Sequence, residues 1–89
     1  MYIHLGQDTV VKKADIIGIF DLDTATVSKR TRDYLAKAEK AGRVINVSTE
    51  LPKSFIVCTK NNEQIIYISQ ISSATLLKRS ESGIEYSLN

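Results

Sequence analysis

The chain opens with three short apolar runs separated by polar residues. Residues 2–5 and 9–12 flank Gly6, Gln7 and Asp8, and this arrangement predicts a β-hairpin. The third run, residues 16–20, does not alternate with polar positions, which predicts a strand covered on both faces. The N-terminal part of the chain is therefore predicted to form strands.

The spacing changes after residue 27. Apolar and small side chains then recur at intervals of three and four residues, as on one face of a helix. Ser28 can serve as the N-cap, and Gly42 stands where a C-cap glycine is expected. The pattern predicts a helix over about residues 28–41.

The second half of the chain predicts more strands and a short helix. A brief strand is expected at 44–47 and a loop at 49–54, because Pro52 cannot donate to a central ladder. Residues 55–59 and 64–69 flank Asn61 and Asn62, which tolerate the left-handed backbone of tight hairpin turns. A short helix is expected from Ser72 or Ser73.

The predicted fold class is α+β, a small, curved, mostly antiparallel sheet with one main helix and a short C-terminal helix. A single domain spans 1–80, followed by a polar tail, 81–89, in which Ile84 and Tyr86 could act as anchors.

The strands of the second hairpin are apolar on both sides, at 55–58 and 65–68. The two predicted helices can cover only about one face of such a sheet. Either the sheet curls into a small barrel-like sandwich, or the second face is a self-association surface. The sequence leaves both explanations open.

Composition limits the chain to one small domain. It has 89 residues, of which 43% are hydrophobic and 25% charged, as in ordinary soluble domains. The N-terminus does not read as a signal peptide, and no apolar run approaches the roughly 18 residues of a membrane span. The single cysteine, Cys58, forms no internal disulfide. We expect a cytoplasmic protein with no membrane partner.

Candidate catalytic residues are few. Asp21 and Asp23 follow the third apolar run with the Asp-x-Asp spacing of haloacid-dehalogenase phosphatases, but Ala25 stands where that class needs Thr or Val, and no late acidic pair for magnesium follows. His4 and Cys58 lie within predicted strands and read as packed residues. We therefore expect no enzyme activity, no metal, no cofactor and no small-molecule substrate.

Positive charge is concentrated at the start of the main predicted helix. Between residues 28 and 43 six basic residues stand against two acids. Cations in the first turn oppose the helix dipole by about 0.3–1 kcal/mol each, so their presence indicates a use. Helix N-termini with flanking cations bind phosphate oxygens, which makes a nucleic-acid backbone the natural partner. The alternative is a solvated face neutralised by nearby acids, Asp21, Asp23 and Asp33.

The predicted contacts are with phosphates of duplex DNA. Lys29, Arg30 and Lys53 are the main candidates, with Lys13 and Arg32 as helpers. Tyr34 and Phe55 are expected on apolar faces, so stacking on bases is less favoured than contact with phosphates.

Four blocks of the chain resemble the DUF370 family of bacterial proteins, the RemA-like and RemB-like regulators. They are residues 1–6, 14–21, 51–54 and 71–79, and together they span nearly the whole chain apart from the tail. The resemblance implies a LytTR-like fold, assembly into ring-like homo-oligomers, and non-enzymatic, DNA-binding regulation of transcription of extracellular matrix (biofilm) genes.

RemA-like proteins carry two arginines in the loop before the hairpin, where this chain retains only Lys53. A ring-forming interaction module without direct DNA binding is therefore the alternative function. Association with the nucleoid is compatible with the DNA-binding function.

Overall fold

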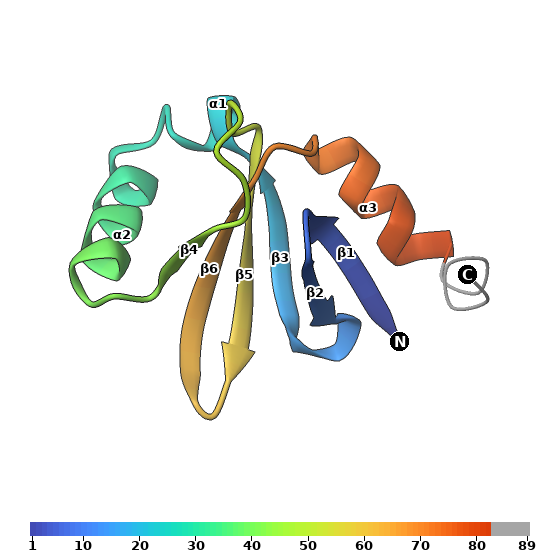
Figure 1. The fold of residues 1–89 in the computed structure, drawn as a ribbon. Coiled ribbons are helices and arrows are strands. Elements are labelled where there is room, and N and C mark those ends of the chain that lie inside the picture. Colours follow the sequence, from blue (N-terminus) through green and yellow to red (C-terminus); the bar gives the residue numbers. More distant parts are fainter. Residues whose placement is uncertain (83–89) are drawn as a thin grey trace.

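Two β-sheets and three α-helices make up the computed structural model, which describes residues 1–82 (Figure 1). A two-stranded sheet pairs β1 (Tyr2–Gly6) with β2 (Thr9–Lys12). The larger sheet has the strand order β3-β5-β6-β4, formed by β3 (Ile16–Asp21), β5 (Ser54–Lys60), β6 (Glu63–Ser69) and β4 (Val44–Asn46). The helices are α1 (Leu22–Ala25), α2 (Lys29–Lys40) and α3 (Ser73–Ser82), and a 3-10 turn, η1 (Lys13–Asp15), joins β2 to β3.

The predicted α+β class is confirmed, with two differences. The strands form two sheets instead of one, and the larger sheet is mixed because β4 runs parallel to β6. The helix α1 was not predicted, since four residues are too few to show helical periodicity. It forms because the Asp21 carboxylate accepts a hydrogen bond from the Thr24 N–H (3.1 Å), which caps its first turn.

Capping and turn residues act as the sequence predicts. The Ser28 side chain accepts the Thr31 N–H at the start of α2, and Gly42 has a φ of +73° just after its end. Asn61 and Asn62 have φ values of 53° and 67° between β5 and β6. Helix α3 continues to Ser82, past the predicted start of the tail, and Ile84 and Tyr86 lie outside the described residues.

Both faces of the larger sheet are covered within the chain. On one face Ile56 and Cys58 of β5 pack against a cluster from the N-terminal hairpin and α3. On the other face Phe55 and Val57 pack against α2 through Ala38. Figure 1 shows the hairpin and α3 on one side of the sheet and α2 on the other. The predicted helices could cover only one face of the sheet, and the N-terminal hairpin covers the other. The cover does not come from a single sheet that curls on itself.

Strand β3 is an exception, and the prediction that it is covered on both faces is wrong. Ile16 and Ile19 belong to the hairpin side of the core, but Ile17 is 58% exposed and Phe20 is 42% exposed. The register shifts between Ile16 and Gly18, and this bulge adds a residue to the strand opposite β5. Because α2 packs over the other strands of the sheet, the α2 side of β3 remains open.

Two buried serines fasten the hairpin and α3 to the sheet. The hydroxyl of Ser69 donates to the Leu5 carbonyl of β1 (2.6 Å) and accepts the Ile71 N–H (3.0 Å). Its cross-strand neighbour Ser54 donates to the Ile71 carbonyl (2.7 Å). These bonds satisfy backbone groups where the chain leaves β6 for α3, and they fix the position of that corner.

Candidate nucleic-acid interface

Three of the predicted DNA-contact residues lie at one end of the larger sheet. The Leu22 N–H of α1 donates to the Lys53 carbonyl (3.0 Å), and the Lys53 N–H donates to the Ser69 carbonyl (2.8 Å), so the loop before β5 is fixed beside α1. Residues 26–28 then lead from α1 to Lys29 and Arg30. Figure 1 shows α1, this loop and the start of α2 in its upper part. We call Lys29, Arg30 and Lys53 the cation cluster.

The cations of this cluster are largely unneutralised. The side chains of Arg30 and Lys53 are exposed and have no hydrogen bond or ion pair with any residue in the described range. The Lys29 ammonium lies 3.4 Å from the Asp33 carboxylate, but these side chains are 82% and 61% exposed, and such surface pairs contribute about 0–1 kcal/mol. The positive charge therefore remains available to an anionic partner.

The acids expected to neutralise the helix start do so only in part. Asp33 pairs with Lys29, whereas Asp21 is engaged in capping α1. Within residues 1–82, neither Asp21 nor Asp23 forms an ion pair with a cation of α2. These ion pairs are therefore too few to neutralise the cations at the start of α2.

Arg32 differs from Lys29 and Arg30 because its side chain bonds to backbone carbonyls. Its guanidinium donates to the carbonyls of Thr26 (2.7 Å) and Val27 (2.9 Å), in the connection between α1 and α2. The side chain adds positive charge, but its donors hold the connection in place. Arg32 thus positions the start of α2.

Lys13 is not brought to the cluster. It lies in η1, before β3, whereas the cluster lies beyond the end of β3. A strand of six residues rises about 20 Å, so Lys13 and the neighbouring Lys12 belong to the opposite end of the sheet.

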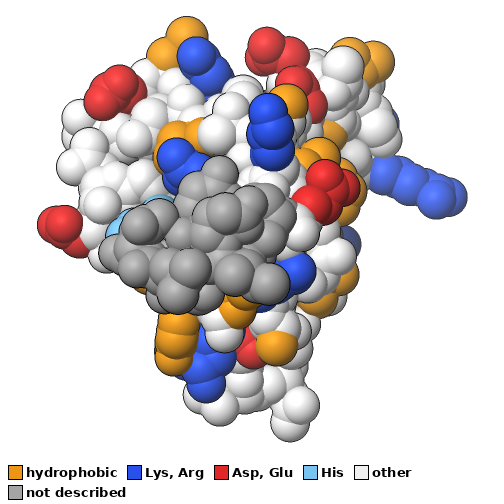
Figure 2. Space-filling view, turned by 90° about the vertical axis from the view of Figure 1, so that its right-hand side faces the viewer, with side chains coloured by type: hydrophobic (Ala, Val, Ile, Leu, Met, Phe, Trp, Pro, Cys, Tyr) orange, Lys and Arg blue, Asp and Glu red, His pale blue; other side chains and the backbone are white. Residues whose placement is uncertain are grey.

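The side of the molecule formed by α3 and the hairpin is mixed in charge. Figure 2 shows Lys and Arg side chains there interspersed with acidic ones. Arg79 donates to the His4 carbonyl (2.9 Å) and so ties α3 to β1. On this side, acidic side chains therefore interrupt the positive charge of the described residues.

A groove beside Arg30 lies over the open side of β3. Its volume is about 340 Å³, and it is lined by Ile17, Phe20, Ala25, Arg30, Thr31, Tyr34, Phe55, Val57 and Gln64. We call it the Phe20 groove. The rings of Phe20 and Phe55 stack with centroids 5.0 Å apart and an angle of 21° between their planes. The Tyr34 hydroxyl donates to the Gln64 side-chain carbonyl on its wall. Sequence reasoning missed Phe20 here, although Gly18 within an apolar run is a signal of a bulge.

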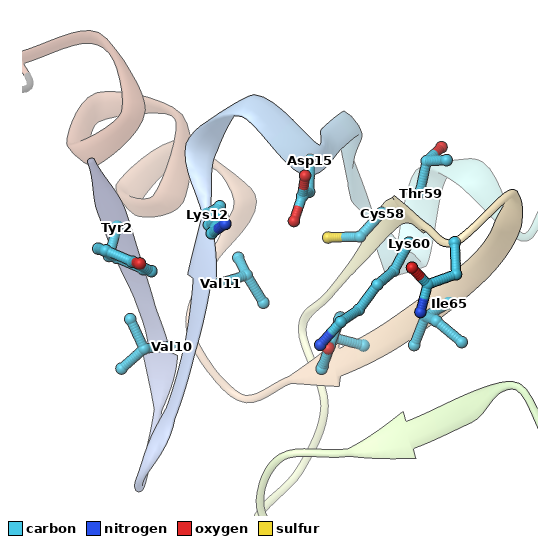
Figure 3. A pocket seen from close by; sticks show the side chains of 11 residues that line it. Tyr2, Val10, Val11, Lys12, Asp15, Cys58, Thr59, Lys60 and Ile65 are labelled. Atoms are coloured by element: carbon cyan, nitrogen blue, oxygen red, sulfur yellow. The ribbon is translucent and has the colours of Figure 1, made fainter.

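A second cavity, of about 400 Å³, lies between the N-terminal hairpin and the β5–β6 hairpin (Figure 3). The Asp15 carboxylate and the Cys58 thiol point toward each other across it. Burial, with a smaller contribution from Asp15, raises the pKa of the Cys58 thiol to about 11. A protonated thiol that is 3% exposed is a poor nucleophile, in agreement with its interpretation as a packed residue.

Comparison with known proteins identifies the family. The family model of RemA-like proteins, described as extracellular matrix regulatory protein A-like, matches residues 2–79. The chain belongs to the RemA-like family. It is also 42% identical, over 81 residues, to extracellular matrix regulatory protein B of Bacillus subtilis (strain 168), with 91% of each chain covered. The resemblance inferred from the four sequence blocks is confirmed.

The RemA-like match includes the whole cation cluster and the Phe20 groove, and it ends within α3. By its description the family is one of regulatory proteins. Among residues 1–82 no three His, Cys, Asp or Glu side chains gather in a way that could hold a metal ion. In the same range no helix has the length and apolar character needed to cross a membrane.

Proposed function

We propose that this protein is a non-enzymatic, DNA-binding regulator of transcription that acts on extracellular matrix (biofilm) genes as a ring-like homo-oligomer in the cytoplasm. The observation that carries the proposal is the cation cluster, in which Arg30 and Lys53 have unpartnered side chains in the described chain. The names of the family and of its Bacillus subtilis relative support the regulatory role and the matrix target.

Phosphate oxygens of duplex DNA are the ligand that suits this cluster. Ser28 caps the Thr31 N–H, but the N–H groups of Lys29 and Arg30 have no acceptor within residues 1–82. Those two amides carry the positive end of the α2 dipole, and two cationic side chains extend from the same residues. Lys53 adds a third cation from the loop fixed beside α1. Contacts of this type bind the backbone and carry little sequence information.

Exposed apolar side chains on the N-terminal hairpin support self-association. Met1, Tyr2 and Val10 are all exposed there, although the opposite face of the same hairpin is buried in the core. Burying this face against another copy would remove it from water. A homo-oligomer would also repeat the cation cluster once per subunit, so that one DNA molecule could engage several clusters at once.

The site is tested by the salt dependence of duplex binding. We expect the double substitution Lys29→Ala, Arg30→Ala to weaken binding and to reduce the slope of log K against log salt by roughly 1.8 per bound subunit, because two phosphate contacts are lost. Lys37→Ala, Lys40→Ala is the matched control, since it removes the same charge from the other end of α2. If the two double variants behave alike, the site assignment is wrong.

The second candidate is a ring-forming interaction module that does not bind DNA directly. The presence of a single cation, Lys53, in the loop before β5 favours it. This alternative predicts no mobility shift with any duplex at moderate salt, together with an oligomeric mass by light scattering. A monomer at micromolar concentration would contradict the ring in both candidates.

A further inference from the structure

We propose that the Phe20 groove binds one unpaired nucleobase, stacked on Phe20, while Arg30 holds the adjoining phosphate. The preferred ligand is then a nucleic acid with a base outside the helical stack. The inference rests on the proposed contact between Arg30 and a phosphate, and it goes further by assigning a place and a partner to the base.

The Phe20 ring is a fixed platform. It stacks on Phe55, and its far edge lies over Gly18, where an added Cβ would be 2.6 Å from the Phe20 Cζ atom. These contacts restrain the ring, yet Phe20 remains 42% exposed. An aromatic side chain held in place with a free surface is the arrangement on which single bases stack, and such stacking contributes about 1–3 kcal/mol per base.

The charge of the groove selects an anionic ligand. Arg30 is the only charged residue among those that line it in the described chain, and no acid is present. Its guanidinium has no partner within residues 1–82. An apolar protein segment in the groove would desolvate this cation without pairing it, which is unfavourable. A base carrying a phosphate pairs the cation and covers the ring at the same time.

The wall of the groove offers hydrogen bonds to a base edge. Tyr34 donates its hydroxyl proton to the Gln64 side-chain carbonyl, which orients the amide. The NH₂ group of Gln64 has no acceptor within residues 1–82, so it can donate to a ligand. The Tyr34 oxygen can still accept. A donor beside an acceptor is the pattern with which amide side chains read the edges of bases. The groove volume of about 340 Å³ is in the range of sites for small ligands, which supports a single nucleotide as occupant.

The experiment compares two duplexes of the same sequence. One is fully paired, and the other carries a single bulged 2-aminopurine, whose fluorescence is quenched when it stacks. For the wild type we expect quenching and tighter binding of the bulged duplex. Phe20→Leu keeps an apolar side chain and removes the aromatic platform. It should abolish the quenching and weaken binding of the bulged duplex about tenfold, with paired-duplex binding unchanged.

Gln64→Ala is a second variant. It should not disturb the packing of the core, because Gln64 is exposed at the start of β6. We expect it to reduce the preference for the bulged duplex several-fold and to leave the fold unaltered. Lys60→Ala, at the end of β5 and outside the groove, is the control and should change neither quantity.

The outcomes separate this inference from the proposed function. If the wild type binds both duplexes equally and without quenching, the base site is wrong and the phosphate site stands. If it binds neither, both are wrong. If Phe20→Leu changes the oligomeric mass, the groove is a subunit interface, and that result also overturns the base site.

Discussion

The ring of Phe20 occupies the space above Gly18, two residues earlier on β3, that any other residue at position 18 would need for its side chain. The absence of a Cβ at this position lets the ring fold back onto the sheet and stack on Phe55. The glycine that interrupts the apolar run thus shapes the groove proposed to bind a base.

Gly18→Ala should displace the Phe20 ring. Because the displaced ring loses its stack on Phe55, we expect the free energy of unfolding to fall by about 1 kcal/mol, measured by urea denaturation. In a Phe20→Leu background, where no ring lies over position 18, the same substitution should cost less. Equal effects in the two backgrounds would show that the ring and the glycine are not coupled.

Gly42→Ala should destabilise the C-terminus of α2. Gly42 has a φ of +73°, and its N–H donates to Glu39 while that of Arg43 donates to Ala38, the bond pattern of a Schellman motif. No atom of residues 1–82 lies within 4 Å of a Cβ added at Gly42, so the penalty is backbone strain alone, about 1 kcal/mol. Gly42→Asn should cost less, since asparagine tolerates this conformation. A thermal melt that ranks the two variants in the opposite order would refute this explanation.

Ser69→Ala should be among the most damaging single-atom changes. It removes the donor to the Leu5 carbonyl and the acceptor of the Ile71 N–H at a buried corner. We expect a loss of about 1–3 kcal/mol in the free energy of unfolding, because backbone groups are left unsatisfied. Ser48→Ala is the control, since the Ser48 hydroxyl accepts one exposed bond from Glu50, and it should have a small effect.

Alanine substitutions at Arg30 and Arg32 should affect different properties, DNA binding in the first case and stability in the second. Arg32→Ala removes two bonds to the α1–α2 connection, so it should lower the free energy of unfolding by about 1 kcal/mol. Arg30→Ala removes no bond seen in the described chain and should leave stability unchanged while weakening duplex binding. If Arg30→Ala is the less stable variant and Arg32→Ala loses more affinity for DNA, the assigned roles are reversed.

Alkaline pH should destabilise the fold through Cys58. Burial raises the pKa of its thiol to about 11, above the ordinary value of 9.0, so the folded state keeps a proton that the unfolded state releases. Stability from this group is therefore complete below about pH 9 and is lost as pH rises toward 11. Cys58→Ala should flatten the dependence, leaving the contribution of Tyr67, whose pKa is also raised by burial. A wild type as stable at pH 10.5 as at pH 8 would contradict the burial of the thiol.

The thiol should also be slow to react at neutral pH. At pH 8 a thiol reagent should modify Cys58 only after the protein is denatured, because the group is buried and protonated. Rapid modification of the native protein would show that the cavity beside Asp15 opens in solution.

Local patterns in the sequence were sufficient to predict most of the helices and strands. The apolar runs, Ser28, Gly42 and the paired asparagines each act within a few residues of their own position, so their effects can be predicted without knowing the rest of the fold. The four family blocks likewise identified the RemA-like family, because the order and spacing of their residues are properties of the sequence itself. The concentration of cations at the start of α2 is also a property of the sequence alone.

The tertiary structure decided which side chains of those elements are free. Whether β3 is covered depends on where α2 docks, and whether Arg32 is available depends on carbonyls that only the α1–α2 connection brings within reach. Lys53 lies beside α1 at one end of the sheet and Lys13 at the other, because strand direction and order set these positions. The bonds of Arg32 span only five and six residues, but they depend on the turn between α1 and α2, which the sequence pattern did not predict. The other outcomes come from contacts between residues distant in sequence, on which local periodicity carries no information. The sequence by itself determined most of the elements, the family and the charge. The packing of the elements determined that Phe20 and Arg30 share a groove.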